Sequence, residues 1–192
     1  MKNRFFLLSA MLTFLFTQIS KADNLPQSLG NFKSLTKNNS GIEIVTDFGT
    51  LKAIVYSPTI VRIRLSKNGE FDDFSYAVLN QPNITKFEVN DNKSFVSITT
   101  DSLQVIFSKN PVRVKLLNKQ GVVVNEDEPA FGTTWIGEEV TTHKKLFNGE
   151  RFIGLGEKTG GLDRRGQGYT NWNLDYFAYP TNADPLYQTH PF

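Results

Sequence analysis

The sequence contains no cysteine among its 192 residues. A disulfide framework, a cysteine-ligated metal site and a cysteine nucleophile are therefore excluded. Its longest run of acids is Glu126-Asp127-Glu128, which has no histidine nearby in the sequence. Consecutive side chains of an extended chain point to opposite faces, so these three acids would not converge on one ion. We predict a solvated loop at this run, no metal site and no cofactor.

The chain also lacks an excess of basic charge once its first 22 residues are set apart. It has 21 lysines and arginines and 19 aspartates and glutamates. Three of the bases, Lys2, Arg4 and Lys21, lie in the first 22 residues, which contain no acid, and this leaves 18 bases against 19 acids. No cluster of lysine and arginine of the kind that follows a phosphate backbone is present. We therefore expect no nucleic-acid partner.

No apolar run is long enough for a transmembrane helix, which needs about 20 residues. The predominantly apolar run Phe5–Phe16 has 12 residues, follows a basic start, and precedes small residues at the first and last positions of Ser20-Lys21-Ala22. These are the three parts of a secretory signal. We expect residues 1–22 to be a signal peptide, so that the mature chain is exported to the periplasm or the medium and has no membrane association. A retained N-terminal anchor is the alternative.

Helical periodicity is absent between Asp23 and Glu150. Short runs rich in β-branched residues occur instead, several with apolar residues at alternate positions, and turn-forming residues separate them. The expected strands are Ile42–Val45, Leu51–Tyr56, Ile60–Leu65, Phe74–Leu79, Thr85–Val89, Phe95–Thr99, Leu103–Phe107, Val112–Leu116 and Val122–Val124. Asp23–Ser40 is too sparse in apolar residues to predict a core element. The spacing predicts an all-β fold, an antiparallel β-sandwich or barrel.

The last fifth of the chain, Phe152–Phe192, is denser in glycines, aromatics, charges and prolines than an ordinary surface loop. We expect Arg151-Phe152-Ile153 to form a strand that leads into Gly154-Leu155-Gly156. This glycine pair lacks the third glycine and the following helix of a dinucleotide-binding loop, so that function is excluded.

Charged residues in this stretch allow a structural and a functional interpretation. Glu157 and Lys158 fit an ion pair that locks the loop, which we favour over a direct functional role. Asp163, Arg164 and Arg165 fit either a clamp for a carbohydrate or carboxylate ligand or an ion pair within the protein. We favour the internal ion pair, in which Asp163 is bound by one of the two arginines.

The segment Trp172–Phe177 interleaves an acid, an amide and aromatic rings within six residues. Sugars present hydroxyl groups, which carboxylates and amides bind, and C–H faces, which aromatic rings cover. Ligand sites in general combine apolar walls with a few placed polar groups. Sugar binding and an aromatic packing loop are equally compatible with this spacing.

The same stretch contains, in order, Gly154–Gly160, Leu162–Gly166, Trp172-Asn173 with Asp175, Asp184–Tyr187 and Pro191-Phe192. This collinear succession closely resembles the N-terminal β-domain of glycoside hydrolase family 31, the α-glucosidase and α-xylosidase group. The resemblance implies a galactose-mutarotase-like β-sandwich over residues 23–192, incomplete at its C-terminus. It implies further that this is the first, non-catalytic domain of a retaining α-glycoside hydrolase, truncated before the catalytic barrel.

The resemblance also implies roles for single residues. The loop of residues 170–180 would reach the barrel and form one wall of the sugar pocket, with Asp175 as the substrate-binding residue and Trp172 and Asn173 holding the loop. Both catalytic carboxylates of the family lie on the barrel, so we assign no catalytic residue here and expect this fragment to be inactive alone. The expected partners are an α-linked oligosaccharide and the barrel of the parent chain.

Two other functions fit an all-β fold of this size. A stand-alone carbohydrate-binding module of similar sandwich form is the alternative that we keep. A mutarotase-like enzyme is excluded, because its histidine and glutamate acid–base pair has no counterpart around His143 or His190. We expect His143 to be a surface residue of a strand.

The signal sequence gives the first testable prediction. Because Ser20-Lys21-Ala22 places small residues at the positions that a signal peptidase requires, cleavage is expected after Ala22. N-terminal sequencing of secreted material should begin at Asp23. A full-length product that stays in the cytoplasm would contradict the prediction.

Overall fold

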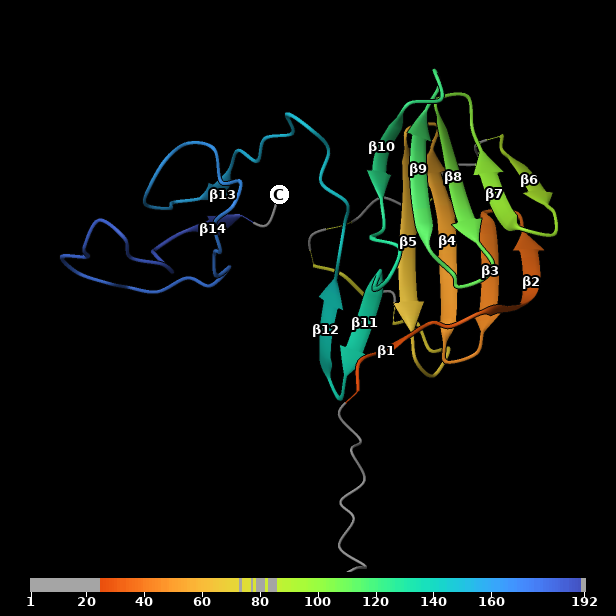
Figure 1. The fold of residues 1–192 in the computed structure, drawn as a ribbon, viewed down its shortest axis with the longest axis horizontal. Helices are drawn as coiled ribbons and strands as arrows, with labels where there is room; N and C mark the ends of the chain where they lie inside the picture. Colours follow the sequence, from red (N-terminus) through yellow and green to blue (C-terminus); the bar gives the residue numbers. More distant parts are fainter. Residues whose placement is uncertain (1–24, 73, 77, 79–81, 83–85, 191–192) are drawn as a thin grey trace, which may run out of the picture. The chain divides into compact units, whose positions relative to one another are not determined.

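The computed structural model describes residues 25–72, 74–76, 78, 82 and 86–190 (Figure 1). The predicted signal peptide, Pro191-Phe192 and parts of the two strands expected between residues 74 and 89 lie outside these residues. The chain divides into two compact units, Met1–Lys145 and Leu146–Phe192, which are described separately below as unit 1 and unit 2.

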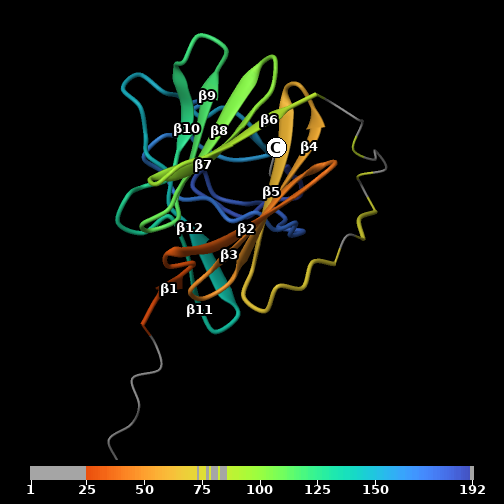
Figure 2. The same cartoon turned by 90° about the vertical axis from the view of Figure 1, so that its right-hand side faces the viewer.

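Unit 1 contains two antiparallel sheets stacked face to face, which Figure 1 shows one in front of the other and Figure 2 shows from the side. The first has four strands in the order β2-β3-β4-β5, and the second has five in the order β10-β9-β8-β7-β6. Their bounds are Phe32–Asn38 (β2), Gly41–Thr46 (β3), Thr50–Ser57 (β4), Ile60–Ser66 (β5), Glu88–Asp91 (β6), Phe95–Thr99 (β7), Leu103–Ser108 (β8), Val114–Asn118 (β9) and Val123–Glu126 (β10).

The core lies between these two sheets. Alternate residues of the central strands point inward and are at most 1% exposed, as expected for a sheet with one buried face. They are Ile42 and Ile44 of β3, Leu51, Ala53 and Val55 of β4, Val96 and Ile98 of β7, and Val105 and Phe107 of β8. The predicted antiparallel sandwich is therefore confirmed. No helix long and apolar enough to cross a membrane occurs in the described part of the chain.

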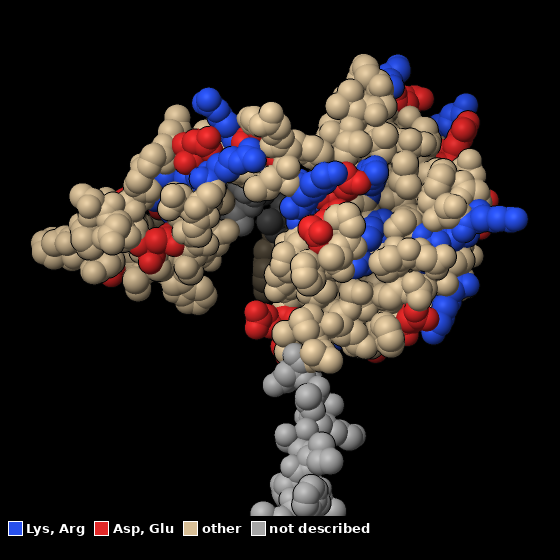
Figure 3. All heavy atoms as spheres, viewed as in Figure 1, with Lys and Arg blue, Asp and Glu red and all other residues tan. Residues whose placement is uncertain are grey.

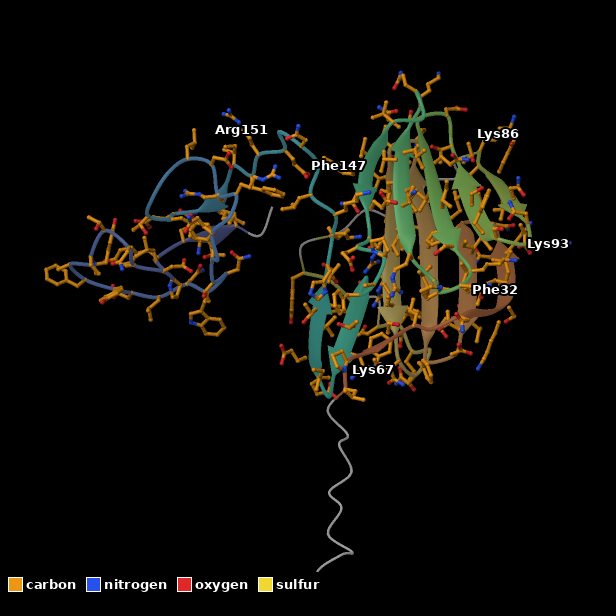
Figure 4. All side chains as sticks on the ribbon, in the orientation of Figure 1. Phe32, Lys67, Lys86, Lys93, Phe147 and Arg151 are labelled. Atoms are coloured by element: carbon orange, nitrogen blue, oxygen red, sulfur yellow. The ribbon has the colours of Figure 1, made fainter. Side chains whose placement is uncertain are left out.

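Several parts of unit 1 differ from the prediction. The described residues of the strand expected at Phe74–Leu79, namely Phe74, Ser75, Tyr76 and Val78, do not form a strand. Asp23–Ser40 was expected to hold no core element, but Phe32–Asn38 forms β2, an edge strand that pairs with β3. Its backbone supplies the pairing, and Phe32 and Leu35 are the side chains that it packs against the core. Phe32 is labelled in Figure 4, and the ammonium of Lys109 lies 4.2 Å from its ring centroid.

A third, small sheet was not predicted at all. It has the order β1-β11-β12, with bounds Gln27–Ser28, Thr133–Ile136 and Glu139–Thr142. A two-residue turn joins β11 to β12, and Gly137 supplies the positive φ of 57° that such turns require. The indole N–H of Trp135, which is 7% exposed, donates to Gln27 Oε1 at 3.1 Å and ties β11 to β1. The strands β11 and β12 are mostly polar, so they lack the alternation of apolar residues from which a strand is predicted.

The run of acids at residues 126–128 is not a solvated loop, and that prediction was wrong. Asp127 is 6% exposed: one carboxylate oxygen accepts the Val114 N–H at 2.8 Å, and the other accepts Lys144 Nζ at 2.6 Å. Glu126, pointing the other way, pairs with Lys115 at 2.7 Å, and this hydrogen bond holds the pKa of Glu126 below its ordinary value. Acidic and basic side chains accordingly lie side by side on the face of unit 1 that Figure 3 shows.

Replacing Asp127 tests this reassignment. Asp127→Ala leaves the buried Val114 N–H without its side-chain acceptor, so the free energy of unfolding should fall by about 2 kcal/mol. Glu138→Ala is the matched control, because that side chain is fully exposed and its closest cation lies 4.0 Å away. Urea unfolding of both variants measures the difference. Equal midpoints for the two variants would show that Asp127 has no structural role.

Candidate functional site

Unit 2 contains little regular structure. Its one ladder in the described residues joins β13, Leu155–Gly156, to β14, Thr189–His190. Gly156 has a φ of +81°, and a Cβ there would lie 2.6 Å from the carbonyl oxygen of Gln188, so glycine is required for this pairing. The strand predicted at Arg151–Ile153 is absent; the ladder begins two residues later. Most of unit 2 is therefore held by side chains rather than by backbone pairing.

Lys158 is at the centre of these contacts. Its side chain is 0% exposed, and its ammonium donates to Thr170 O at 2.6 Å, to Asp184 Oδ1 at 2.8 Å and to Thr189 Oγ1 at 3.4 Å. An ammonium has three donors, and here each has an acceptor, as a buried cation requires.

The expected pair of Lys158 with Glu157 is therefore not formed. Glu157 is instead 3.4 Å from the hydroxyl of Tyr179, which donates to its carboxylate. The true partner of Lys158, Asp184, is 26 positions further along the chain. Neighbouring residues in an extended segment point apart, which is why adjacency in the sequence was a poor guide to this ion pair.

Asp184 completes the contact from the other side. Its side chain is 18% exposed; Oδ1 accepts Lys158 Nζ, and Oδ2 accepts the backbone N–H of Thr170. Burial alone would raise the pKa of Asp184, but the hydrogen bonds from Lys158 and Thr170 and the charge of Lys158 hold it below its ordinary value. The carboxyl group of Asp184 is therefore ionised at neutral pH.

The segment around Trp172 is pinned to the end of the described chain. The side-chain oxygen of Asn173 accepts the Thr189 N–H at 2.9 Å, and Thr189 Oγ1 donates to Trp172 O at 3.2 Å. The Leu174 N–H donates to the carbonyl of Leu186, whose side chain is 1% exposed. Asn173 therefore holds the loop as predicted. Trp172 contributes its carbonyl to that role, whereas its indole is 67% exposed.

Asp175 lies on the exposed side of this loop. Among the described residues its carboxylate forms no hydrogen bond or ion pair. Burial raises the pKa of the Tyr187 hydroxyl, and the charge of Asp175 raises it further. Large apolar and aromatic side chains on the same loop are also exposed: Trp172, Leu174, Tyr176, Phe177 and Tyr179. The loop therefore combines an unpaired acid with uncovered aromatic rings.

The trio at 163–165 is structural, but not as an ion pair with its neighbours. Asp163 Oδ1 accepts the N–H groups of Phe152 at 3.2 Å and of Arg165 at 3.1 Å, and the closest guanidinium is that of Arg151 at 4.0 Å. Figure 4 marks Arg151 in unit 2. The predicted pairing of Asp163 with the Arg164 or Arg165 side chain was wrong, because both guanidiniums are used on carbonyl oxygens.

Those carbonyls fix the turns on either side. Arg164 donates to Thr159 O at 2.9 Å and to Gly161 O at 2.7 Å, and its guanidinium lies 5.3 Å from the Tyr169 ring centroid. Arg165 donates to the carbonyls of residues 147 and 150. A guanidinium that offers five donors in a rigid fork suits this use, which secures loops that have no backbone ladder of their own.

Comparison with known proteins identifies the family of the chain. Residues 50–192 match the family described as the glycosyl hydrolase 31 N-terminal galactose mutarotase-like domain. The match includes most of the sandwich and all of unit 2. The chain therefore belongs to glycoside hydrolase family 31, through the N-terminal β-domain of that family, and the resemblance drawn from the sequence is confirmed.

Individual relatives are glycosidases. The chain is 33% identical over 167 residues to alpha-glucosidase 2 of Bacillus thermoamyloliquefaciens, covering 85% of this chain and 21% of the relative. A dextranase of Flavobacterium johnsoniae, solved in complex with isomaltotriose, is 30% identical, with a TM-score of 0.80 over 86% of this chain and 21% of that one. An α-xylosidase from Xanthomonas citri, at 18% identity and a TM-score of 0.60 over 68% of this chain and 16% of that one, shows the fold alone. The chain thus spans about a fifth of the length of the first two.

Asp163 offers a test of how unit 2 is held together. Asp163→Ala removes the acceptor of two backbone N–H groups, so the melting temperature should fall and amide exchange at Phe152 and Arg165 should accelerate. Asp163→Asn keeps one oxygen acceptor and should lose less. Equal melting temperatures for the alanine variant and the natural protein would contradict this role.

The same carboxylate sets a pH dependence. The backbone N–H groups of Arg165 and Phe152 hold the pKa of Asp163 below its ordinary value. A lowered pKa means that this contribution is fully present above the unfolded-state pKa of about 3.9 and is lost as the pH falls through the folded-state pKa. The difference between natural protein and Asp163→Ala should therefore disappear in acid.

Proposed function

We propose that this chain is the N-terminal part of an exported α-glycosidase of the α-glucosidase type, and that its 170–180 loop forms one wall of the sugar pocket. The family assignment and the alpha-glucosidase relative support the reaction class. The dextranase that was solved with isomaltotriose supports α-linked glucose oligomers as the class of substrate. The two carboxylates that cleave the glycosidic bond would come from a further domain of the parent enzyme.

The unpaired carboxylate of Asp175 is the observation that carries the binding role. An acid that the protein itself does not satisfy is available to accept hydrogen bonds from the hydroxyl groups of a sugar. Charged acceptors make stronger hydrogen bonds than neutral ones, which suits a site that must compete with water for those hydroxyls. The alternative, a stand-alone carbohydrate-binding module, would use the same carboxylate without a barrel.

The aromatic side chains supply the second half of sugar recognition. The indole of Trp172 and the rings of Tyr176 and Phe177 are exposed within three residues of Asp175. Rings of this kind cover the C–H faces of a pyranose and exclude water from the polar contact beside them. In this account unit 2 binds and orients the substrate, and it transfers no proton and forms no covalent intermediate.

Replacing Asp175 tests the proposal in the complete enzyme. A hydrogen bond to a charged acceptor is worth roughly 1.5–3 kcal/mol, so Asp175→Ala should lower kcat/KM for an α-linked oligosaccharide by about ten- to a hundredfold. The melting temperature should not change, because the side chain is exposed and has no partner to lose. Steady-state kinetics and a thermal melt measure the two effects.

Asp101→Ala serves as the matched control, since Asp101 is an exposed acid of unit 1. It should leave both quantities unchanged. An Asp175→Ala enzyme with natural kcat/KM, or one that no longer folds, would remove the pocket-wall assignment.

A further inference from the structure

We propose that Lys158 and Asp184 act as a positioning pair, which sets where the 170–180 loop stands and thereby how well the enzyme binds its oligosaccharide. The inference rests on the proposed function of that loop and adds to it the residues that give the loop its geometry. Neither residue would touch the sugar.

The pair holds Thr170 from both sides. The Thr170 carbonyl accepts from the Lys158 ammonium at 2.6 Å, and the Thr170 N–H donates to the Asp184 carboxylate. Both polar groups of one peptide-chain residue are thus bound to the two members of one salt bridge. Because those bonds are directional, they fix the point at which the loop begins as well as its direction there.

Thr189 connects the salt bridge to Trp172 and Asn173. The Thr189 hydroxyl accepts a hydrogen bond from Lys158 Nζ at 3.4 Å and donates one to the carbonyl of Trp172 at 3.2 Å. The backbone N–H of Thr189 donates to Oδ1 of Asn173 at 2.9 Å. The residues from 170 to 173 are therefore tied directly or through one residue to the salt bridge. Asp175 follows two positions later, and bonds from Leu174 N to Leu186 O and from the Tyr187 hydroxyl to Tyr176 O hold its two neighbours.

A charged pair suits positioning better than it suits stability. Removing two charges from water costs about as much as their attraction returns, so a buried ion pair adds little net stability compared with apolar residues of similar volume. Contacts between apolar side chains do not depend on angle as hydrogen bonds do, so an apolar pair would not fix the orientation of the loop. The four hydrogen bonds that Lys158 and Asp184 make together define one loop conformation, which two packed alkyl groups would not specify.

Three variants of the full-length enzyme separate positioning from stability: Lys158→Met, Asp184→Asn, and the double variant with Lys158→Met and Asp184→Leu. The double variant replaces the ion pair by apolar side chains and should melt close to the natural enzyme. Arg151→Met is the matched control, because Arg151 is a cation of unit 2 whose side chain is 77% exposed.

Two readouts are needed. Hydrogen exchange of residues 168–176 should be at least tenfold faster in all three variants, while exchange in β3, β4, β7 and β8 stays unchanged. The KM for isomaltotriose should rise about tenfold with little change in kcat, since the 170–180 loop would bind the substrate and would not take part in bond cleavage. Arg151→Met should match the natural enzyme in both.

The outcomes are distinguishable. Natural exchange at 168–176 in the double variant would overturn the positioning role, as would a natural KM in that variant when Asp175→Ala lowers kcat/KM. If Asp175→Ala has no effect on kcat/KM, the proposed function fails, whereas accelerated exchange in the three variants would still support Lys158 and Asp184 as the pair that positions the loop. If one of the three variants does not fold, hydrogen exchange and KM of the other two are compared with those of the natural enzyme.

Discussion

The buried salt bridge between Lys158 and Asp184 links separate segments of unit 2. The described part of this unit has no helix and a single ladder of two residues, so backbone pairing cannot fix its loops. The fully buried ammonium of Lys158 and the carboxylate of Asp184 supply part of the missing constraint, since each bonds to more than one segment, and the contacts of residues 163–165 supply another part. A loop that is held in this way can leave Asp175 and its aromatic neighbours uncovered without losing its shape.

Unit 1 is built on a different physical basis. Its two sheets exclude water from a continuous layer of aliphatic side chains and Phe107, and its ion pairs lie around the edge of that layer. Apolar burial is strong but carries no direction, which is sufficient for a scaffold. In unit 2, whose described part has a single ladder of two residues, directional hydrogen bonds of side chains hold the loops. The two units therefore differ in the forces that stabilise them.

The sequence predicted those parts of the fold in which side-chain alternation is strong. The central strands β3, β4, β7 and β8 match their predicted ranges to within two residues at either end, because one face of each is fully buried. The edge strand β2 and the hairpin β11–β12 escaped prediction, since backbone pairing rather than apolar side chains defines them. In the candidate site, the loop was located from its composition. The partner of Lys158 could not be predicted, because a contact between residues 26 positions apart produces no pattern in the sequence around either of them.

The proposed role of the 170–180 loop can be tested by a crystal structure of the complete enzyme with an α-linked oligosaccharide bound. We expect a carboxylate oxygen of Asp175 within hydrogen-bonding distance of a sugar hydroxyl. We also expect an intact contact between Lys158 and Asp184 and an aromatic ring of residues 172–177 against the sugar. An oligosaccharide bound at the catalytic carboxylates with no atom near the 170–180 loop would contradict the proposed role.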